Sequence, residues 1–213
     1  MTQTAILHYL FDPLCGWCYG ASATIGALAK HPDIDLRPHA TGLFAGNGAR
    51  PMKSFATQAW ANDQRIAKLS GQRFTETYRQ QVLGDDDASL DSTVTTLAVA
   101  AVADSAPDRM IEALSVLQAA RYVDGRDVTS ATVVAEVLAD LGLADAAARV
   151  LAPDAGLADL VRAQTAEARS LMTTHGLQGV PALVAEVDGA RRGLDASVLY
   201  SGPDAVLAAL GRG

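Results

Sequence analysis

The sequence predicts an α/β fold in which strands from both ends of the chain form one sheet and a helical segment lies between them. Three observations lead to this prediction. Residues 5–40 follow a strand–helix–strand pattern, apolar residues within 51–176 recur at helical spacing, and strand patterns return after Gly179. With 213 residues, 49% of them hydrophobic, the chain can bury the core of one large domain or of two small ones.

The first 40 residues are predicted to form a βαβ unit. Residues 5–11 are a short apolar run, which is typical of a strand buried within a parallel sheet. An alanine-rich helix is expected over 18–30, and the proline within 31–33 ends it. Residues 34–40 alternate between apolar and polar side chains and are expected to form the second strand. A helix that joins two strands in this way places them parallel to each other.

Helices are expected throughout the middle of the chain. A glycine-rich loop at 41–50 precedes them, and nearly every segment from 51 to 176 has a helical apolar period. The stripe of Met110, Leu114 and Leu117 is one example, and a proline-containing helix start precedes it. Glycine, aspartate and proline residues divide the segment into several helices, at Gly71, 84–87, Gly125 and Pro153.

The C-terminal part is predicted to form a hairpin and a closing helix. Residues 182–187 are expected as a strand, Asp188-Gly189 as a turn, and a second strand is expected within 191–200. A proline and an aspartate then favour a helix start, so a last helix is expected over 205–210. The simplest arrangement of all these elements is one sheet with two parallel strands and a C-terminal hairpin.

The two cysteines of the chain, Cys15 and Cys18, lie between the first strand and the first helix. A helix N-terminus carries a partial positive charge and unpaired N–H groups, which favour a thiolate. Cys15 would lie at that terminus and is the candidate nucleophile, whereas Cys18, one turn later, is the candidate resolving thiol. The intervening Gly16 and Trp17 provide no histidine that could stabilise the thiolate further. The pattern therefore predicts a thiol–disulfide redox pair.

Three other interpretations of the cysteine pair are weaker. A zinc site needs four ligands, and the four histidines of the chain are scattered without ligand spacing. An iron–sulfur cluster shared between two chains would also need ligands from elsewhere. Two buried thiols without a chemical role are the third alternative, which the position between strand and helix disfavours. We therefore expect no metal at this site.

Charge and hydropathy exclude several classes of partner. The formal net charge of −7 gives no support to nucleic-acid binding, which usually leaves a basic surface. The first residues lack the basic start and long apolar run of a secretory signal, and no stretch approaches the ~18 apolar residues of a membrane span. We expect a cytoplasmic protein without membrane contact, in which a Cys-x-x-Cys pair is more often catalytic than structural.

Two sequence motifs resemble those of a known family. The first is 11–20, Phe-Asp-Pro-Leu-Cys-Gly-Trp-Cys-Tyr-Gly, and the second is 179–183, Gly-Val-Pro-Ala-Leu. Together with the order of strands and helices, they resemble the DsbA-like family of thioredoxin-fold proteins, and especially its cytoplasmic FrnE-like branch. The resemblance implies a discontinuous thioredoxin-like domain, residues 1–45 and 178–213, with an inserted all-helical domain, residues 46–177.

The resemblance also implies roles for residues near the cysteine pair. The family residue that matches Pro181 is a cis-proline beside the active disulfide, and the backbone of Val180 would hydrogen-bond an extended substrate segment there. Gly16 and Trp17 are expected beside the substrate, although the Trp17 ring could instead pack against the inserted domain. Periplasmic DsbA-type oxidants carry a secretory signal and a Pro-His dipeptide, and this chain has neither. The resemblance therefore does not imply a strong oxidant.

The expected function is thiol–disulfide exchange by a disulfide isomerase-like or reductase-like enzyme. Cys15 would attack a disulfide of a protein or small-molecule partner, and Cys18 would resolve the mixed disulfide. The redox-active disulfide itself would serve in place of a cofactor, with glutathione as a candidate reductant or ligand.

Two alternatives stay open. The same fold includes 2-hydroxychromene-2-carboxylate isomerases and kappa-class glutathione transferases, which typically have serine at the position matching Cys15. A glutathione-dependent isomerase or transferase is therefore the first alternative, and a non-enzymatic redox-sensing module is the second. A homodimer through the helical segment is also left open.

Overall fold

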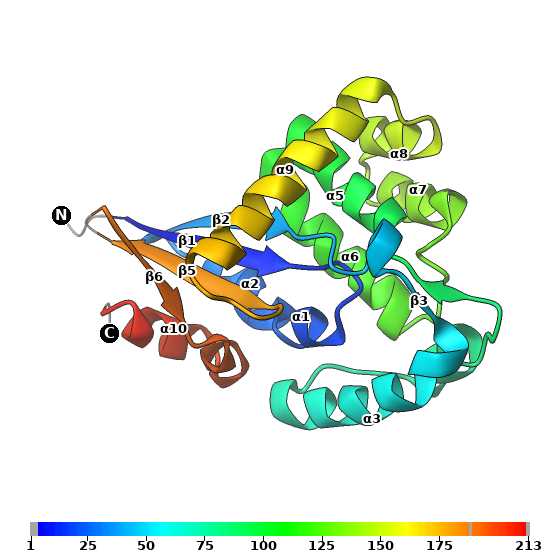
Figure 1. The fold of residues 1–213 in the computed structure, drawn as a ribbon, viewed down its shortest axis with the longest axis horizontal. Helices are drawn as coiled ribbons and strands as arrows, with labels where there is room; N and C mark the ends of the chain where they lie inside the picture. The colour runs from blue at the N-terminus through cyan, green and yellow to red at the C-terminus, as the bar shows by residue number, and fades with distance from the viewer. Residues whose placement is uncertain (1–3, 188, 212–213) are drawn as a thin grey trace.

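A four-stranded sheet with the strand order β2-β1-β5-β6 organises the chain. The computed structural model describes residues 4–187 and 189–211 (Figure 1). The strands are β1 (Ala5–Phe11), β2 (Ile34–Ala40), β5 (Ala182–Val187) and β6 (Ala190–Leu194). β1 pairs in parallel with β2 and antiparallel with β5, and β5 forms an antiparallel hairpin with β6. The predicted sheet built from both ends of the chain is confirmed.

Helices cover both faces of this sheet, as Figure 1 shows. On one face, the C-terminal half of α9 (Ala155–Thr174) packs Leu171 into a cluster with Leu10, Ala182 and Val184 of the strands. On the other face, the strands share the main core with α2 (Ser22–Leu28) and α10 (Pro203–Ala209). The alternation of side chains along β1 therefore assigns neighbouring residues to two separate apolar layers.

The segment between β2 and β5 is mostly helical, as predicted. Its longer helices are α3 (Met52–Ser70), α5 (Thr93–Ser105), α6 (Met110–Tyr122), α7 (Ala131–Asp140), α8 (Ala144–Leu151) and α9. Its shorter elements are α4 (Glu76–Tyr78), a π-helical turn at Arg79–Leu83, and 3-10 turns at Gly46–Gly48 and Pro107–Arg109. Because α9 also covers the sheet, this helix joins the helical segment to the strands, and the domain limits 46–177 stay a prediction.

Two short strands, β3 (Arg50–Pro51) and β4 (Ser89–Leu90), pair antiparallel beside α3. The sequence did not predict them, because a two-residue strand is too short to show an alternating pattern.

None of the helices in the described part of the chain is long and apolar enough to cross a membrane.

The helix expected over 18–30 is in fact two helices, α1 (Gly16–Gly20) and α2, which meet at Ala21. The backbone of Ala21 has φ −81° and ψ −8°, so the helix is interrupted at a residue that normally favours helix. The two pieces have different neighbours, since α1 packs against α3 whereas α2 packs against α6 and α10. Tertiary packing therefore divides a stretch that its composition predicts to be continuous.

The second strand of the C-terminal hairpin lies at the start of the range 191–200 in which it was expected. β6 ends at Leu194, and a 3-10 helix (Ala196–Ser201) occupies most of the rest of that range. The carboxylate of Asp195 accepts a hydrogen bond from the Ser197 N–H at 2.9 Å and so starts this helix. The expected turn contains Asp188, which lies outside the described residues.

Candidate active site

The cysteine pair lies directly after β1, at the start of α1. Cys15 precedes the first helical residue with extended backbone angles, φ −82° and ψ 117°, and its N–H donates to the carbonyl of Asp12 at 3.1 Å. The Cys15 residue is 6% exposed, whereas Cys18 is completely buried. Cys15 therefore lies at the helix N-terminus and is the more accessible of the two thiols.

The burial of Cys18 shifts the pKa of its thiol. Its pKa is raised well above the ordinary range, first because burial disfavours the thiolate and second because of a hydrogen bond with the Cys15 thiol. Both cysteines are free thiols in this structure. Cys18 is thus held as a neutral thiol in contact with the more exposed Cys15.

A buried aspartate fixes the turn that carries Cys15. Asp12 is completely buried, and one of its carboxylate oxygens accepts a hydrogen bond from the Leu14 N–H at 2.9 Å. The other oxygen accepts from the Phe44 N–H at 3.0 Å and from the Ser92 hydroxyl at 2.8 Å. Burial raises the pKa of Asp12, and these three hydrogen bonds oppose the shift. Asp12 therefore ties the cysteine turn to the glycine-rich loop and to the start of α5.

Residues from the far end of the chain meet the cysteine turn. The Cys15 thiol donates to the carbonyl of Val180 at 3.5 Å. The Val180–Pro181 peptide bond is cis, as the resemblance implies, and both residues are half-buried. The sheet thus brings Val180 and Pro181 beside a thiol that lies 165 positions away in the sequence.

The dipeptide between the cysteines contacts two different parts of the molecule. A Cβ atom at Gly16 would lie 2.6 Å from Oδ1 of Asp63, so the absence of a side chain allows α3 to approach the cysteine turn. The half-buried Trp17 ring packs edge-on against Tyr200, with ring centroids 5.6 Å apart, and the Tyr200 hydroxyl donates to the Trp17 carbonyl at 3.0 Å. Trp17 therefore contacts the C-terminal segment of the chain.

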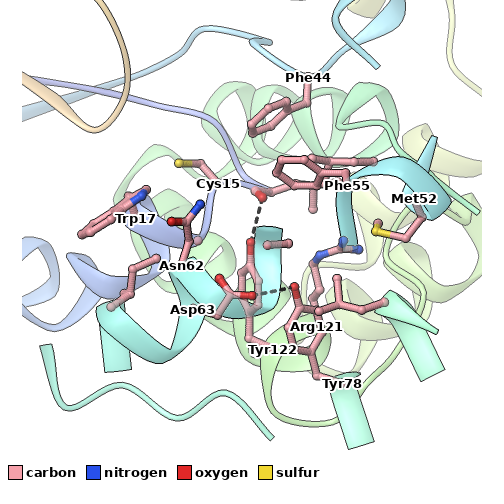
Figure 2. A pocket seen from close by; sticks show the side chains of 16 residues that line it. Cys15, Trp17, Phe44, Met52, Phe55, Asn62, Asp63, Tyr78, Arg121 and Tyr122 are labelled. Carbon is pink, nitrogen blue, oxygen red and sulfur yellow. Dashed lines mark hydrogen bonds between the residues drawn. The ribbon is translucent and has the colours of Figure 1, made fainter. Parts of the chain in front are cut away.

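A mostly apolar cavity opens beside Cys15, Gly16 and Trp17 (Figure 2). It lies between the cysteine turn and the helical segment. Phe44, Met52 and Phe55 form part of its wall, as Figure 2 shows. The polar members of the wall are Asn62, Asp63, Tyr78, Arg121 and Tyr122. The space beside the cysteine pair is therefore a cavity that carries several polar groups.

A buried carboxyl group in this cavity has a strongly shifted pKa. Asp63 is 4% exposed, and the Tyr78 hydroxyl donates to its Oδ2 atom at 3.1 Å. Burial raises the pKa of Asp63 to about 7, although the hydrogen bond from Tyr78 and the charge of Arg121 act in the opposite direction. Asp63 is therefore largely protonated at pH values below neutral.

This shift makes the stability of the protein depend on pH. An aspartate in the unfolded chain has a pKa of about 3.9, so between about pH 4 and pH 7 the folded state holds a proton that the unfolded state has lost. The stabilising contribution of that proton is complete below about pH 4 and disappears as the pH rises through about 7. Asp63→Asn removes the carboxyl group that binds this proton, and with it this pH-dependent contribution. We expect the free energy of unfolding of Asp63→Asn, relative to wild type, to rise by about 2 to 3 kcal/mol from pH 5 to pH 8.

Urea denaturation at pH 5, 6, 7 and 8 measures this difference. Asp140→Asn, at an exposed position on α7, is the matched control and should follow wild type at every pH. A constant difference between Asp63→Asn and wild type across this range would contradict the shifted pKa of Asp63.

Asp63, Tyr78 and Arg121 were not predicted as site residues, although the sequence pattern contains a signal for two of them. Asp63 lies on the buried stripe of α3 between Ala59 and Ile66, and Arg121 continues the buried stripe of α6 after Leu117. A charged residue within an apolar helical stripe is buried and so needs a compensating partner or a function.

In the described residues, no three His, Cys, Asp or Glu side chains are grouped so that they could hold a metal ion.

Comparisons with known proteins agree with this geometry. A sequence profile of the DSBA-like thioredoxin domain matches residues 6–198. The structure of the cytosolic disulfide reductase DsbM from Pseudomonas aeruginosa is similar, with 36% identity, 97% of each chain covered and a TM-score of 0.85. A second structure of that reductase, with GSH, gives 34% identity, the same coverage and a TM-score of 0.82.

A more distant structure shares the fold alone. It is a 2-hydroxychromene-2-carboxylate isomerase, with 18% identity, a TM-score of 0.61, and coverage of 97% of this chain and 95% of that one. No curated protein matched in a separate sequence search. Since the domain profile spans nearly the whole chain, this protein belongs to the DsbA-like thioredoxin-domain family.

Proposed function

We propose that this protein is a thiol–disulfide reductase or isomerase in which Cys15 is the nucleophile and Cys18 the resolving thiol. The observation that carries the proposal is the asymmetry of the pair. Cys15 lies at the start of α1 and retains 6% exposure, whereas the completely buried Cys18 thiol contacts it from inside the protein. The more accessible thiol is suited to attack a substrate disulfide, and a neutral thiol behind it is suited to the second step.

The proposed cycle consists of two exchange steps. The Cys15 thiolate attacks one sulfur of a substrate disulfide, a mixed disulfide forms, and the other substrate sulfur leaves as a thiolate that takes a proton from solvent. Cys18 loses its proton and attacks the Cys15 sulfur, which releases the second substrate thiol and leaves a Cys15–Cys18 disulfide. The protein is oxidised by two electrons and the substrate is reduced. Two molecules of an external thiol then restore the reduced pair and leave as a disulfide.

The substrate would lie between the cysteine turn and the Val180–Pro181 segment. The Val180 carbonyl already accepts a hydrogen bond from the Cys15 thiol, so an extended substrate could use the neighbouring backbone atoms. Gly16 belongs to the wall of the cavity, and Trp17 offers a half-buried aromatic ring beside the same thiol. These four residues are the proposed substrate-binding set, with Val180 and Pro181 on one side and Gly16 and Trp17 on the other.

The similar proteins support a cytosolic reductase in preference to a secreted oxidant. The structurally similar Pseudomonas aeruginosa protein is a cytosolic disulfide reductase whose structure was also solved with GSH. We therefore propose glutathione, or another small-molecule or protein thiol, as the partner that recycles the cysteine pair in the cytoplasm. Membership of the FrnE-like branch is part of this proposal, and the homodimer stays a prediction.

A glutathione-dependent isomerase is the second candidate. The cavity beside Cys15 favours it, because a small apolar substrate could bind there next to a thiol. The resemblance to an isomerase structure at 18% identity concerns the fold alone. Conjugation or isomerisation that requires glutathione, and that survives replacement of Cys15 by serine, would favour this candidate.

Trapping the first intermediate tests the proposed roles directly. Cys18→Ala removes the resolving thiol, so Cys15 is expected to retain a mixed disulfide with glutathione after incubation with glutathione disulfide. Intact-protein and peptide mass spectrometry would place one glutathione on Cys15. The matched control is Cys15→Ala, in which the buried Cys18 should react far more slowly. An adduct that forms faster on Cys18 than on Cys15 would reverse the proposed roles, and no adduct on either would refute the exchange cycle.

A further inference from the structure

Arg121 places a buried guanidinium group in the cavity beside Cys15 (Figure 2). The residue is 1% exposed, and its Nε atom has no hydrogen-bond partner in the part of the chain that the structure describes. Among residues 4–187 and 189–211, no acidic side chain forms an ion pair with it. The charge of Arg121 lowers the pKa of Asp63, but the Asp63 carboxyl group accepts its hydrogen bond from the Tyr78 hydroxyl.

A buried charge of this kind is unfavourable unless another group compensates it. Two aromatic rings do so in part, since the guanidinium lies 5.8 Å from the ring centroids of both Tyr78 and Tyr122. Asp63, with a pKa of about 7, supplies a full negative charge only above neutral pH. Arg121 therefore retains capacity to bind an anion that enters the cavity.

The remaining walls of the cavity limit the size and polarity of an anion that could bind there. In addition to its polar groups the cavity is bordered by Phe44, Met52, Phe55 and Leu83, and its volume is about 80 Å³. That volume suits a group of side-chain size and is too small for a whole peptide. In the view of Figure 2, Cys15 and Trp17 lie on one side of the cavity and the guanidinium group of Arg121 lies on the other. Short apolar walls with a cation at one end fit a short aliphatic arm that ends in a carboxylate.

We propose that Arg121 binds the carboxylate of a small thiol or disulfide whose sulfur reacts with Cys15. This inference rests on the exchange cycle proposed above and adds the substrate class. With a symmetrical dicarboxylate disulfide, the Cys15 thiolate forms a bond to one sulfur and the S–S bond breaks. One carboxylate-bearing thiolate leaves and takes a proton from solvent, while the other stays bonded to Cys15, with its carboxylate on Arg121. Cys18 then releases it as a second thiol.

A series of matched disulfides tests the proposal. Reduced wild-type protein is mixed with dithiodialkanoates that have two, three or four methylene groups in each arm, and with the corresponding neutral diamides. The rate constant for oxidation of the cysteine pair is divided by that of dithiothreitol with the same compound, which removes the intrinsic reactivity of each disulfide. We expect a preference of about 10- to 100-fold for the carboxylate over the amide at one arm length, as for a charge-assisted hydrogen bond. The net charge of −7 acts against this preference, so long-range attraction does not explain it.

Arg121→Gln should abolish the carboxylate preference, measured within this variant as the ratio of the normalised rate constants for the carboxylate and the diamide of the same arm length. Arg121→Lys keeps the charge and should retain part of the preference, even if Arg121→Gln proves too unstable to measure. The matched control is Arg79→Gln, which removes the same charge from an exposed arginine that stacks on Trp60 at 5.2 Å. This variant should show the same carboxylate preference as wild type.

The possible failures are distinguishable. If wild-type protein reacts with the diamides but shows no carboxylate preference at any arm length, the role of Arg121 is refuted and the exchange cycle stands. If the preference exists and survives in Arg121→Gln, the carboxylate binds elsewhere. If neither series reacts at the cysteine pair, the proposed function itself fails.

Discussion

Replacing Cys15 with serine is expected to lower the dithiothreitol-driven reduction of insulin by at least about a hundredfold, to the rate of dithiothreitol alone. A serine hydroxyl is not ionised near neutral pH and forms no stable bond to a substrate sulfur, so the first exchange step cannot occur. The substitution changes one atom at a position that is 6% exposed, and we expect the fold to persist. Turbidity of precipitating insulin chains measures the rate, and the thermal unfolding midpoint reports on the fold.

Cys18→Ser is the matched control for this experiment. Cys15 can still attack in this variant, so the expected result is slow turnover together with accumulated mixed disulfide. Wild-type turnover in Cys15→Ser would contradict the assignment of the nucleophile. Equal loss in both variants without any mixed disulfide in Cys18→Ser would argue that the pair acts only as a structural unit.

Asp12→Ala is expected to lower the free energy of unfolding by about 3 to 5 kcal/mol. The substitution leaves the N–H groups of Leu14 and Phe44 and the hydroxyl of Ser92 without their acceptor in a completely buried position. Small proteins are stable by about 5 to 15 kcal/mol, so a loss of this size removes a large fraction of the total. Urea denaturation with a comparison of m-values measures the change.

Asp195→Ala provides the matched comparison. Asp195 also accepts a backbone hydrogen bond, from the Ser197 N–H at 2.9 Å, but it is exposed, so water can replace the lost partner. We expect a loss of about 1 kcal/mol for this helix-capping residue. If Asp12→Ala is no more destabilising than Asp195→Ala, the buried hydrogen bonds of Asp12 do not hold the cysteine turn in place.

The strands were predictable because their signals are local. The bounds of β1, β2 and β5 agree with the expected ranges 5–11, 34–40 and 182–187, since each is an apolar or alternating run that loop or turn residues end. The position of Cys15 at the start of a helix followed from the same reasoning. The break at Ala21 was not predictable, because α1 and α2 separate only through their different packing partners.

The cavity was beyond sequence reasoning for a related physical reason. Asp63, Tyr78 and Arg121 come from three different elements, and no periodicity encodes how those elements meet. The close approach of α3 also depends on Gly16 and Gly20, where a Cβ atom would lie 2.6 Å from Asp63 and 2.5 Å from Ile66. The glycine between the two cysteines therefore has a packing role that its place in the sequence motif does not reveal.

The redox role of Cys15 and Cys18 is tested most directly by equilibrating the protein with glutathione buffers of defined potential and trapping free thiols by alkylation. Mass spectrometry then reports how many alkyl groups each protein molecule carries. We predict one two-electron transition, in which each protein molecule carries either two alkyl groups or none. Its midpoint is expected nearer to about −270 mV than to about −120 mV. Retention of both thiols in excess glutathione disulfide, or separate glutathione adducts without a Cys15–Cys18 disulfide, would contradict a shared redox couple.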